Sequence, residues 1–155
     1  MQVEQRVKVV EVVALDRDPP VLADAAEAVG VVIRRLRDAQ AGCALVSRDD
    51  RLVGIFTERD VLQRVVGVPG VTAQPVADWM TANPDTVTVN DPIRKALRLM
   101  QRGGYRNVPI VDASGRAVGC VRHKDILGYL AEHCPQQVLN LPPDPDQVAE
   151  TREGG

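Results

Sequence analysis

A threonine and an aspartate three residues apart, Thr57 and Asp60, precede the apolar pair Val61-Leu62. A carboxylate can accept hydrogen bonds from two hydroxyl groups at once, and the free N–H groups at a helix start attract phosphate. The tetrad Thr57–Asp60 therefore suits a ligand that carries both hydroxyl groups and a phosphate. The same Thr-x-x-acid spacing is also that of a capping box, which needs no ligand. From these residues alone the two interpretations stay equally open.

A second tetrad, Arg122-His123-Lys124-Asp125, lies 65 residues later. Arginine stands at the place of the threonine, so an ordinary side-chain cap does not explain Asp125. Three potentially positive side chains at a helix start are disfavoured by the helix dipole. The arrangement indicates either that Asp125 neutralises them or that an anion does. A solvated basic turn is the alternative.

Catalytic and metal motifs are weak in the rest of the sequence. The chain has two histidines, His123 and His133, and three cysteines, Cys43, Cys120 and Cys134, without a CxxC pair. This usage favours a reducing compartment over a disulfide framework, and the four ligands of a structural zinc site are missing. GxxxxGK[ST], GxGxxG and nucleophile-elbow motifs are absent too. We expect no metal, no required cofactor and no enzymatic activity, and we interpret Cys120 as a small buried residue in a strand.

Length and composition indicate one ordinary domain or two very small ones in tandem. Of 155 residues, 45% are hydrophobic and 26% charged, which argues against disorder. A net charge of −2 and only four aromatic residues argue against nucleic-acid binding. Apolar runs are too short for a membrane helix, and the first residues do not resemble a signal peptide. We expect a soluble, cytoplasmic protein that binds neither nucleic acid nor membrane.

Two stretches of the chain repeat one another. A shift of 65 places residues 42–62 on residues 107–127 and makes six positions identical. The identical pairs are Val46/Val111, Arg51/Arg116, Val53/Val118, Gly54/Gly119, Asp60/Asp125 and Leu62/Leu127. At this shift the second copy has Arg106 and Pro109 where the first has Ala41 and Ala44. Such internal similarity indicates a duplicated structural unit.

The second copy predicts the element order β-α-β-β-α. Its periodicities indicate strands at 86–89, 108–111 and 117–121, a helix from Ile93, and a last helix at 123–133. Asn90-Asp91-Pro92 is a typical helix start, with proline at the first helical position, and Gly103-Gly104 a typical helix end.

The amino half of the first copy does not register at a shift of 65. Its apolar runs predict a first strand at Val9–Leu15 and an unusually long helix at Leu22–Ala39, so that this copy would have about nine extra residues. We divide the chain into a first repeat at 1–67, a linker at 68–75, a second repeat at 76–133 and a proline-rich tail at 134–155.

Several motifs in order make the chain resemble the CBS (cystathionine-β-synthase) repeat, two of which in tandem form a Bateman module. The resemblance covers about residues 7–133 and is carried by Gly54–Leu62 and Gly119–Leu127, supported by Asn107–Asp112 and Asp78–Thr81. It implies a mixed α/β (α+β) fold of two β-α-β-β-α repeats around a pseudo-twofold axis. The sheets would pack against each other with the helices outside. The family's two clefts commonly hold adenosine-containing ligands, and two modules commonly form a flat dimer.

By this resemblance, one complete cleft places Asp60 on the ribose hydroxyls and Thr57 on the phosphate. The opposite copy would supply two basic residues to the same phosphate, Arg106 and Lys124. The alternative is that Arg106 is a plain surface arginine.

The cleft beside Asp125 differs from this pattern. Arg122 would fill it or clash with a phosphate, and His123 adds a further basic group to the same helix start. Ala41 stands where the other copy has Arg106, so the reciprocal basic contact is missing. We therefore predict one ligand site per chain.

The leading hypothesis is a stand-alone regulatory module that binds AMP, ADP or ATP, forms a homodimer and acts on a separate effector protein. S-adenosylmethionine and NAD are less favoured ligands. The alternative is a ligand-free scaffold that dimerises and docks on an enzyme or transporter. The scaffold is favoured if replacing Asp60 changes stability but no ligand response.

Overall fold

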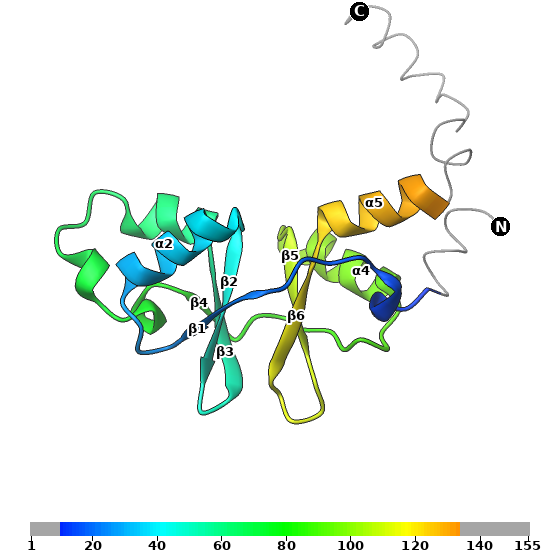
Figure 1. Ribbon diagram of the computed structural model, residues 1–155, viewed down its shortest axis with the longest axis horizontal. Helices are drawn as coiled ribbons and strands as arrows, with labels where there is room; N and C mark the ends of the chain where they lie inside the picture. The colour runs from blue at the N-terminus through cyan, green and yellow to red at the C-terminus, as the bar shows by residue number, and fades with distance from the viewer. Residues whose placement is uncertain (1–9, 134–155) are drawn as a thin grey trace, which may run out of the picture.

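The computed structural model describes residues 10–133. Two similar halves lie side by side, each with a β-hairpin near the centre of the molecule and helices outside it (Figure 1). The chain begins with a 3-10 turn η1 (Val12–Ala14), β1 (Val21–Asp24), α2 (Val29–Ala39), β2 (Cys43–Arg48), β3 (Arg51–Thr57), a single helical turn α3 (Glu58–Asp60) and a π-helical segment η2 (Val61–Val65). It continues with the 3-10 turns η3 (Val71–Ala73) and η4 (Val76–Asp78), β4 (Thr81–Ala82), α4 (Ile93–Gly103), β5 (Asn107–Val111), β6 (Ala117–Arg122) and α5 (His123–His133). The mixed α/β fold of two repeats is confirmed.

The sheets of the two halves differ in size. The first has the order β1-β2-β3-β4, with β1 parallel to β2 and the other pairs antiparallel, whereas the second is the β5–β6 hairpin. The predicted strand at 86–89 is reduced to a single parallel bridge between Val87 and Ile110. The chain turns directly after that bridge, because the Asp91 carboxylate accepts a hydrogen bond from the Thr88 N–H at 2.8 Å. Asp91 therefore does not cap α4, which follows Pro92 without a side-chain cap.

The amino-terminal elements of the first copy contradict the prediction. Within the described part of the predicted strand Val9–Leu15, residues Val12–Ala14 form a 3-10 turn. The predicted helix Leu22–Ala39 begins only at Val29, and its first residues belong to β1.

A period of two explains why this run is a strand. Val21 and Ala23 are buried, whereas Leu22 and Asp24 point to solvent, which is the alternation of a strand rather than of a helix. Pairing with β2 supplies the backbone hydrogen bonds of the run. α2 consequently has 11 residues, as α4 does, so its helix is no longer than its counterpart.

The two copies correspond from their first described element. η1 and α2 lie 64 positions before η4 and α4, and α2 and α4 both end at a left-handed residue, Gln40 and Gly104. The amino halves of the two copies therefore correspond at a shift of 64 rather than 65. The repeat extends through the amino half, and the change of shift by one residue explains why a comparison at 65 does not detect it.

That extra residue lies in the turn of the second hairpin. Val46 pairs with Gly54 and Ile110 pairs with Gly119, so β2 and β5 correspond at a shift of 64 while β3 and β6 correspond at 65. Five residues separate Val111 from Ala117, where four separate their counterparts.

The predicted correspondences in and directly before the first strand of the hairpin are therefore off by one, including Val46/Val111, because Val46 corresponds to Ile110. The counterpart of Pro109 is Leu45 rather than Ala44. The counterpart of Arg106 is Gly42 rather than Ala41, and this position still carries no basic residue.

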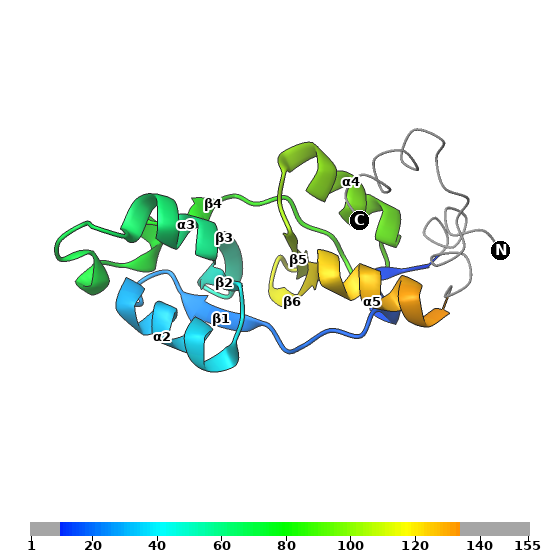
Figure 2. The same ribbon diagram turned by 90° about the horizontal axis from the view of Figure 1, so that it is seen from above.

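Each half receives its first segment from the other copy. Residues 10–15 run to α4 (Figure 1 and Figure 2), where Val12 and Leu15 lie in the core of the second half. Residues 74–79 reach the first core in the same way, where Val76 is fully buried. Equivalent backbone bonds hold the segments: Val12 N–H to Asp91 O and Ile93 N–H to Val10 O in one half, Val76 N–H to Glu27 O and Val29 N–H to Gln74 O in the other. Each core thus combines residues of both copies. The structure therefore does not divide the chain at single positions, and the predicted repeat boundaries stay predictions.

The segment predicted as a linker packs closely on the first half. Val71 of η3 is 4% exposed and belongs to the first core. A Cβ on Gly30 of α2 would lie 3.1 Å from the Cβ of Thr72. This close approach of η3 gives a packing reason for a glycine inside the helix.

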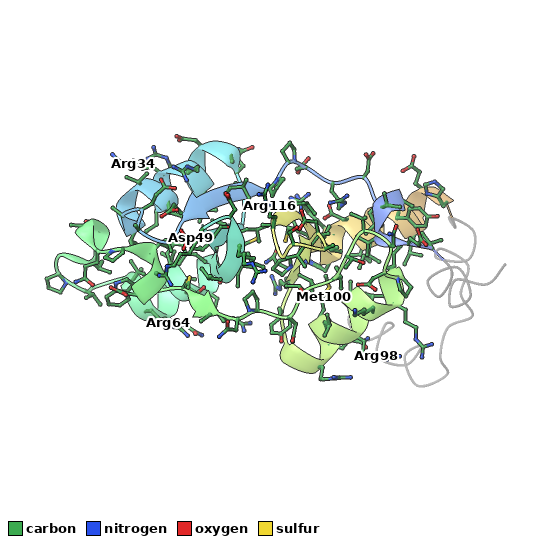
Figure 3. The ribbon with its side chains drawn as sticks, turned by 90° about the horizontal axis from the view of Figure 1, so that it is seen from below. Arg34, Asp49, Arg64, Arg98, Met100 and Arg116 are labelled. Carbon is green, nitrogen blue, oxygen red and sulfur yellow. The ribbon has the colours of Figure 1, made fainter. Side chains whose placement is uncertain are left out.

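The centre of the molecule is an apolar contact between the two hairpins. Its buried residues are Cys43, Leu45 and Ile55 from the first half and Cys120 from the second. Charged side chains such as Arg34 and Arg98 lie on the outer faces of α2 and α4 (Figure 3). Within residues 10–133, no helix is long and apolar enough to cross a membrane.

Candidate ligand clefts at Asp60 and Asp125

α3 begins with the capping box that the Thr-x-x-acid spacing predicts. The Thr57 hydroxyl accepts a hydrogen bond from the Asp60 N–H at 3.3 Å, and the Asp60 carboxylate accepts one from the Thr57 N–H at 2.9 Å. These bonds satisfy donors that a helix start leaves without partners. The capping interpretation is confirmed, and a ligand of Asp60 must share the carboxylate with the cap.

Asp60 is 4% exposed, and hydroxyl groups surround its carboxylate. The Thr57 hydroxyl lies 3.1 Å from Oδ2, and the Thr81 hydroxyl of β4 donates to Oδ1 at 3.0 Å. The Nε atom of Arg64 (Figure 3) is 3.9 Å from Oδ1, so this ion pair is long. Because a carboxylate oxygen can accept two hydrogen bonds, Oδ1 can receive a further hydroxyl.

Thr81 and Arg64 are absent from the predicted site. Arg64 follows Asp60 by four residues, which is the spacing of neighbours on one helix face, so the sequence contains a signal for it. Thr81 is 21 residues from Asp60 along the chain. Only the pairing of β4 with β3 brings it to the carboxylate.

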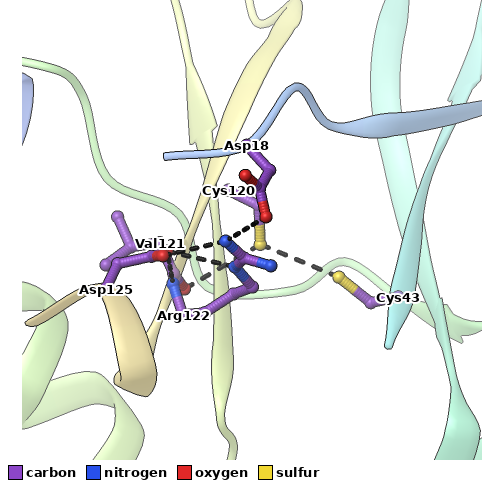
Figure 4. Close-up of polar contacts among 6 residues, drawn as sticks. All are labelled: Asp18, Cys43, Cys120, Val121, Arg122 and Asp125. Carbon is purple, nitrogen blue, oxygen red and sulfur yellow. Dashed lines mark hydrogen bonds and ion pairs between the residues drawn. The ribbon is translucent and has the colours of Figure 1, made fainter. Parts of the chain in front are cut away.

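The corresponding carboxylate in the second half is bound by a guanidinium group (Figure 4). Arg122 donates to Asp125 from Nε at 3.1 Å and from Nη2 at 2.9 Å, and its backbone N–H donates at 2.9 Å. Nη2 also donates to Asp18 at 3.0 Å. The bonds to Asp125, with a smaller contribution from Asp18, raise the pKa of Arg122. Among the interpretations of this tetrad, the structure shows that Asp125 neutralises Arg122.

The side chain that covers each hairpin glycine also differs between the clefts. Met80 lies against Gly54, whereas Arg17 lies against Gly119 at the equivalent place. The Nε atom of Arg17 is buried and has no hydrogen-bond partner among the described residues. The surroundings of the first hairpin and Asp60 therefore include a thioether and hydroxyls, whereas those of the second hairpin and Asp125 include several charged groups.

The remaining predicted residues lie in the second half. Lys124 lines a cavity of about 420 Å³ together with Asp16, Asp125 and Tyr129, among others. Arg106 and His123 are exposed, and the Arg106 carbonyl accepts the His123 N–H at 3.0 Å. No hydrogen bond or ion pair within residues 10–133 joins Arg106 or Lys124 to Asp60. Their assembly into one cleft stays a prediction.

Two thiols lie at the contact between the halves. Cys43 and Cys120 are free and buried, and Cys120 belongs to β6 as the interpretation of a small strand residue expects. Cys134 lies outside the described residues. Within residues 10–133, no group of three or more His, Cys, Asp or Glu side chains is placed to hold a metal ion.

Comparison with known sequences identifies the repeats. The model of the CBS domain matches twice, at residues 10–67 and 76–132. The CBS domain-containing protein CBSCBSPB1 of Arabidopsis thaliana is 35% identical over 91 residues, which are 58% of this chain and 17% of that protein. The uncharacterized protein MK0525 of Methanopyrus kandleri is 36% identical over 84 residues, 54% of this chain and 43% of that protein. The chain thus spans less than half the length of either relative.

Solved structures of similar proteins have the same fold. The CBS domain protein PAE2072 from Pyrobaculum aerophilum, complexed with AMP, is 26% identical with a TM-score of 0.69, over 79% of this chain and 99% of that one. The CBS domain pair of protein MJ0100, in complex with 5-methylthioadenosine and S-adenosyl-L-methionine, is 22% identical with a TM-score of 0.71, over 80% and 98%. At this identity the second comparison concerns the fold alone.

Proposed function

Because the chain belongs to the CBS-domain family and carries two copies of the domain, we propose that it is a regulatory module that binds one adenine nucleotide, AMP, ADP or ATP, in the cleft at Asp60. The ligand would favour one arrangement of the two halves over others, which is the requirement for a regulatory response. The module itself catalyses no reaction, and it acts on a separate effector protein.

The observation that carries this proposal is the hydroxyl environment of Asp60. Thr81 donates its hydroxyl to Oδ1 at 3.0 Å, which is the bond that a ribose hydroxyl would make. Exchange of one neutral hydroxyl for another leaves no charge unpaired, so the cost of replacing Thr81 is small. The AMP complex of PAE2072, a protein of the same fold at 26% identity, supports an adenine nucleotide as the ligand.

The phosphate would lie at the start of α3, near the Thr57 hydroxyl. Arg106 and Lys124 belong to the opposite copy and have exposed side chains; in this proposal both bind that phosphate. S-adenosylmethionine needs no such contact, so these two side chains separate a phosphorylated ligand from an unphosphorylated one. NAD, with its pyrophosphate, belongs with the phosphorylated ligands.

A calorimetric titration with AMP, ADP, ATP and S-adenosylmethionine tests the proposal. We expect one nucleotide per chain in the wild type, no binding in Asp60→Asn, and unchanged binding in the matched variant Asp125→Asn. A ligand at a hundred times its Kd stabilises the fold by about 2.7 kcal/mol, which raises Tm by roughly 5–10 °C. Equal affinity in Asp60→Asn and wild type, or no binding at millimolar concentration, would overturn it.

A ligand-free scaffold is the second candidate, and the capping box favours it because it already gives Asp60 a structural role. The homodimer belongs to both candidates. Leu62 and Leu127, equivalent residues after the two tetrads, are 73% and 61% exposed, and a homodimer would cover such side chains. Sedimentation of Leu62→Glu and Leu127→Glu tests this dimer; a mass unchanged from wild type in both variants argues against it.

A further inference from the structure

Cys43 of β2 and Cys120 of β6 meet where the two halves touch. Their Sγ atoms are 3.8 Å apart (Figure 4), and each residue is 7% exposed. Leu45 and Ile55 pack around them in the apolar contact between the hairpins. Each half supplies one thiol, so a bond between them would join the two repeats.

The thiol pair occurs on one side of the pseudo-twofold axis. The hairpin registers equate Cys43 with Asn107 and Cys120 with Ile55. The equivalent pair on the other side therefore contains no sulfur. One bond would fix one edge of the contact and leave the other edge as it is.

A cation lies beside this pair. Arg122 follows Cys120 by two residues in β6, so both side chains lie on one face of that strand (Figure 4). The hydrogen bond between the two thiols and the charge of Arg122 lower the pKa of Cys43, whereas burial and the charge of Glu58 oppose this shift. The same hydrogen bond and burial raise the pKa of Cys120. The thiolate is the reactive form of a cysteine, and the lowered pKa favours Cys43 as that thiolate.

We propose that Cys43 and Cys120 form an oxidation site at which a peroxide joins the two halves by a disulfide. The Cys43 thiolate attacks one peroxide oxygen and the O–O bond breaks, which gives a sulfenic acid and hydroxide. The hydroxide takes up the proton that the Cys43 thiol lost on ionising and becomes water. The Cys120 sulfur then displaces hydroxide from the Cys43 sulfur, and its proton completes a second water. In total, two thiols lose two electrons and two protons to one peroxide. The sulfur atoms must approach from 3.8 Å to about 2.05 Å.

The position of the disulfide connects it to both clefts. Cys43 pairs with Thr57 in the β2–β3 ladder, and Cys120 precedes Arg122 by two residues. The bond would close a loop between residues 77 apart, which restricts the unfolded chain strongly. The proposal itself stands without a nucleotide, because only the two thiols and the peroxide take part.

The test treats the full chain with hydrogen peroxide, in the wild type and in Cys134→Ser. After alkylation of the remaining thiols and proteolysis, mass spectrometry should show the Cys43 and Cys120 peptides joined in both proteins and separated by dithiothreitol. We expect the oxidised form to melt about 5–10 °C higher than the reduced form. Cys43→Ser and Cys120→Ser should each lack the joined peptides and the rise in Tm.

Two results would overturn the proposal. One is that both thiols of Cys134→Ser remain open to alkylation, under denaturing conditions, after a peroxide dose that oxidises Cys134 in the wild type. The other is that Cys43 accumulates as sulfinic acid without the joined peptides. Both results are read from chains that retain the native Cys43 and Cys120, so neither depends on a variant that fails to fold.

Discussion

The clefts at Asp60 and Asp125 share one backbone frame and differ in what binds the carboxylate. Each aspartate is the third residue of a helix and accepts the N–H of the residue three positions earlier at 2.9 Å. Hydroxyl groups complete the shell of Asp60, whereas the guanidinium of Arg122 completes that of Asp125. Neutral donors can be exchanged for those of a ligand, but removal of a guanidinium leaves a charge unpaired. The duplicated fold places the carboxylate, and the residue three positions earlier decides whether a hydroxyl or a guanidinium group of its own helix start contacts it.

The largest expected effect on stability comes from Asp125→Ala. It leaves Arg122, whose side chain is 19% exposed, with Asp18, which is 74% exposed. Loss of one partner of a buried pair costs about 3–5 kcal/mol, and we expect about 2–4 kcal/mol because Asp18 remains. Urea unfolding measures the loss. The matched variant Asp18→Ala should lose less than about 1 kcal/mol, and equal losses would contradict the importance of the buried pair.

Arg122→Thr gives the second tetrad the Thr-x-x-Asp pattern of the first and removes one difference between the clefts, the guanidinium group on Asp125. If the proposed function is correct, Asp125 then becomes free to accept ribose hydroxyls, and the number of nucleotides bound per chain rises from one to two. Calorimetry gives this number directly. Arg122→Lys retains a cation beside Asp125 and should stay at one nucleotide. Two nucleotides bound by the wild type would mean that Arg122 does not block its cleft.

Thr57→Ala tests the first cleft, where Thr57 both caps α3 and contacts Asp60. It removes the cap of α3 and one hydroxyl beside Asp60, and the loss of a cap costs about 1 kcal/mol. Thermal unfolding should show this loss, together with weaker nucleotide binding. Thr57→Ser retains the hydroxyl and should behave as the wild type does. A variant Thr57→Ala with unchanged stability would show that the capping box contributes nothing.

The smallest expected effect concerns two equivalent acids, Glu27 and Asp91, that lie 64 positions apart. The pKa of Glu27 is lowered first by the hydrogen bond from Arg35, and that of Asp91 first by the Thr88 N–H and then by Lys95. A folded-state pKa below the ordinary values of 4.5 and 3.8 gives stability that is present above those values. It is lost as the pH falls through the folded-state pKa.

Glu27→Gln and Asp91→Asn should therefore each flatten the acid limb of the stability curve. We expect less than about 1 kcal/mol for each, because both ion pairs lie near the surface. The free energy of unfolding, measured by urea between neutral pH and pH 3, records the change. An acid limb identical to that of the wild type in both variants would show that these contacts do not contribute.

Prediction from sequence succeeds where the signal is local and periodic. The last helix was expected at 123–133 and lies at His123–His133, because its start follows directly from a strand and a basic-acidic tetrad. The same reasoning fails at Leu22–Ala39, which contains a short strand and a helix. The strand depends on parallel pairing with β2, about twenty residues away, and such pairing leaves only a weak alternation in the sequence.

The candidate clefts divide in the same way. Hydrogen bonds within one helix start, between Thr57 and Asp60 or between Arg122 and Asp125, connect residues three positions apart, so the sequence alone offered them among its interpretations. Tertiary structure decided that Thr81 donates to Asp60 and that Asp18 reaches Arg122 from 104 residues away. Both partners come from segments that cross between the copies. These segments are held by packing in the two cores, where each half contains residues of the other copy. Such packing joins residues far apart in the chain, so no local sequence pattern predicts it.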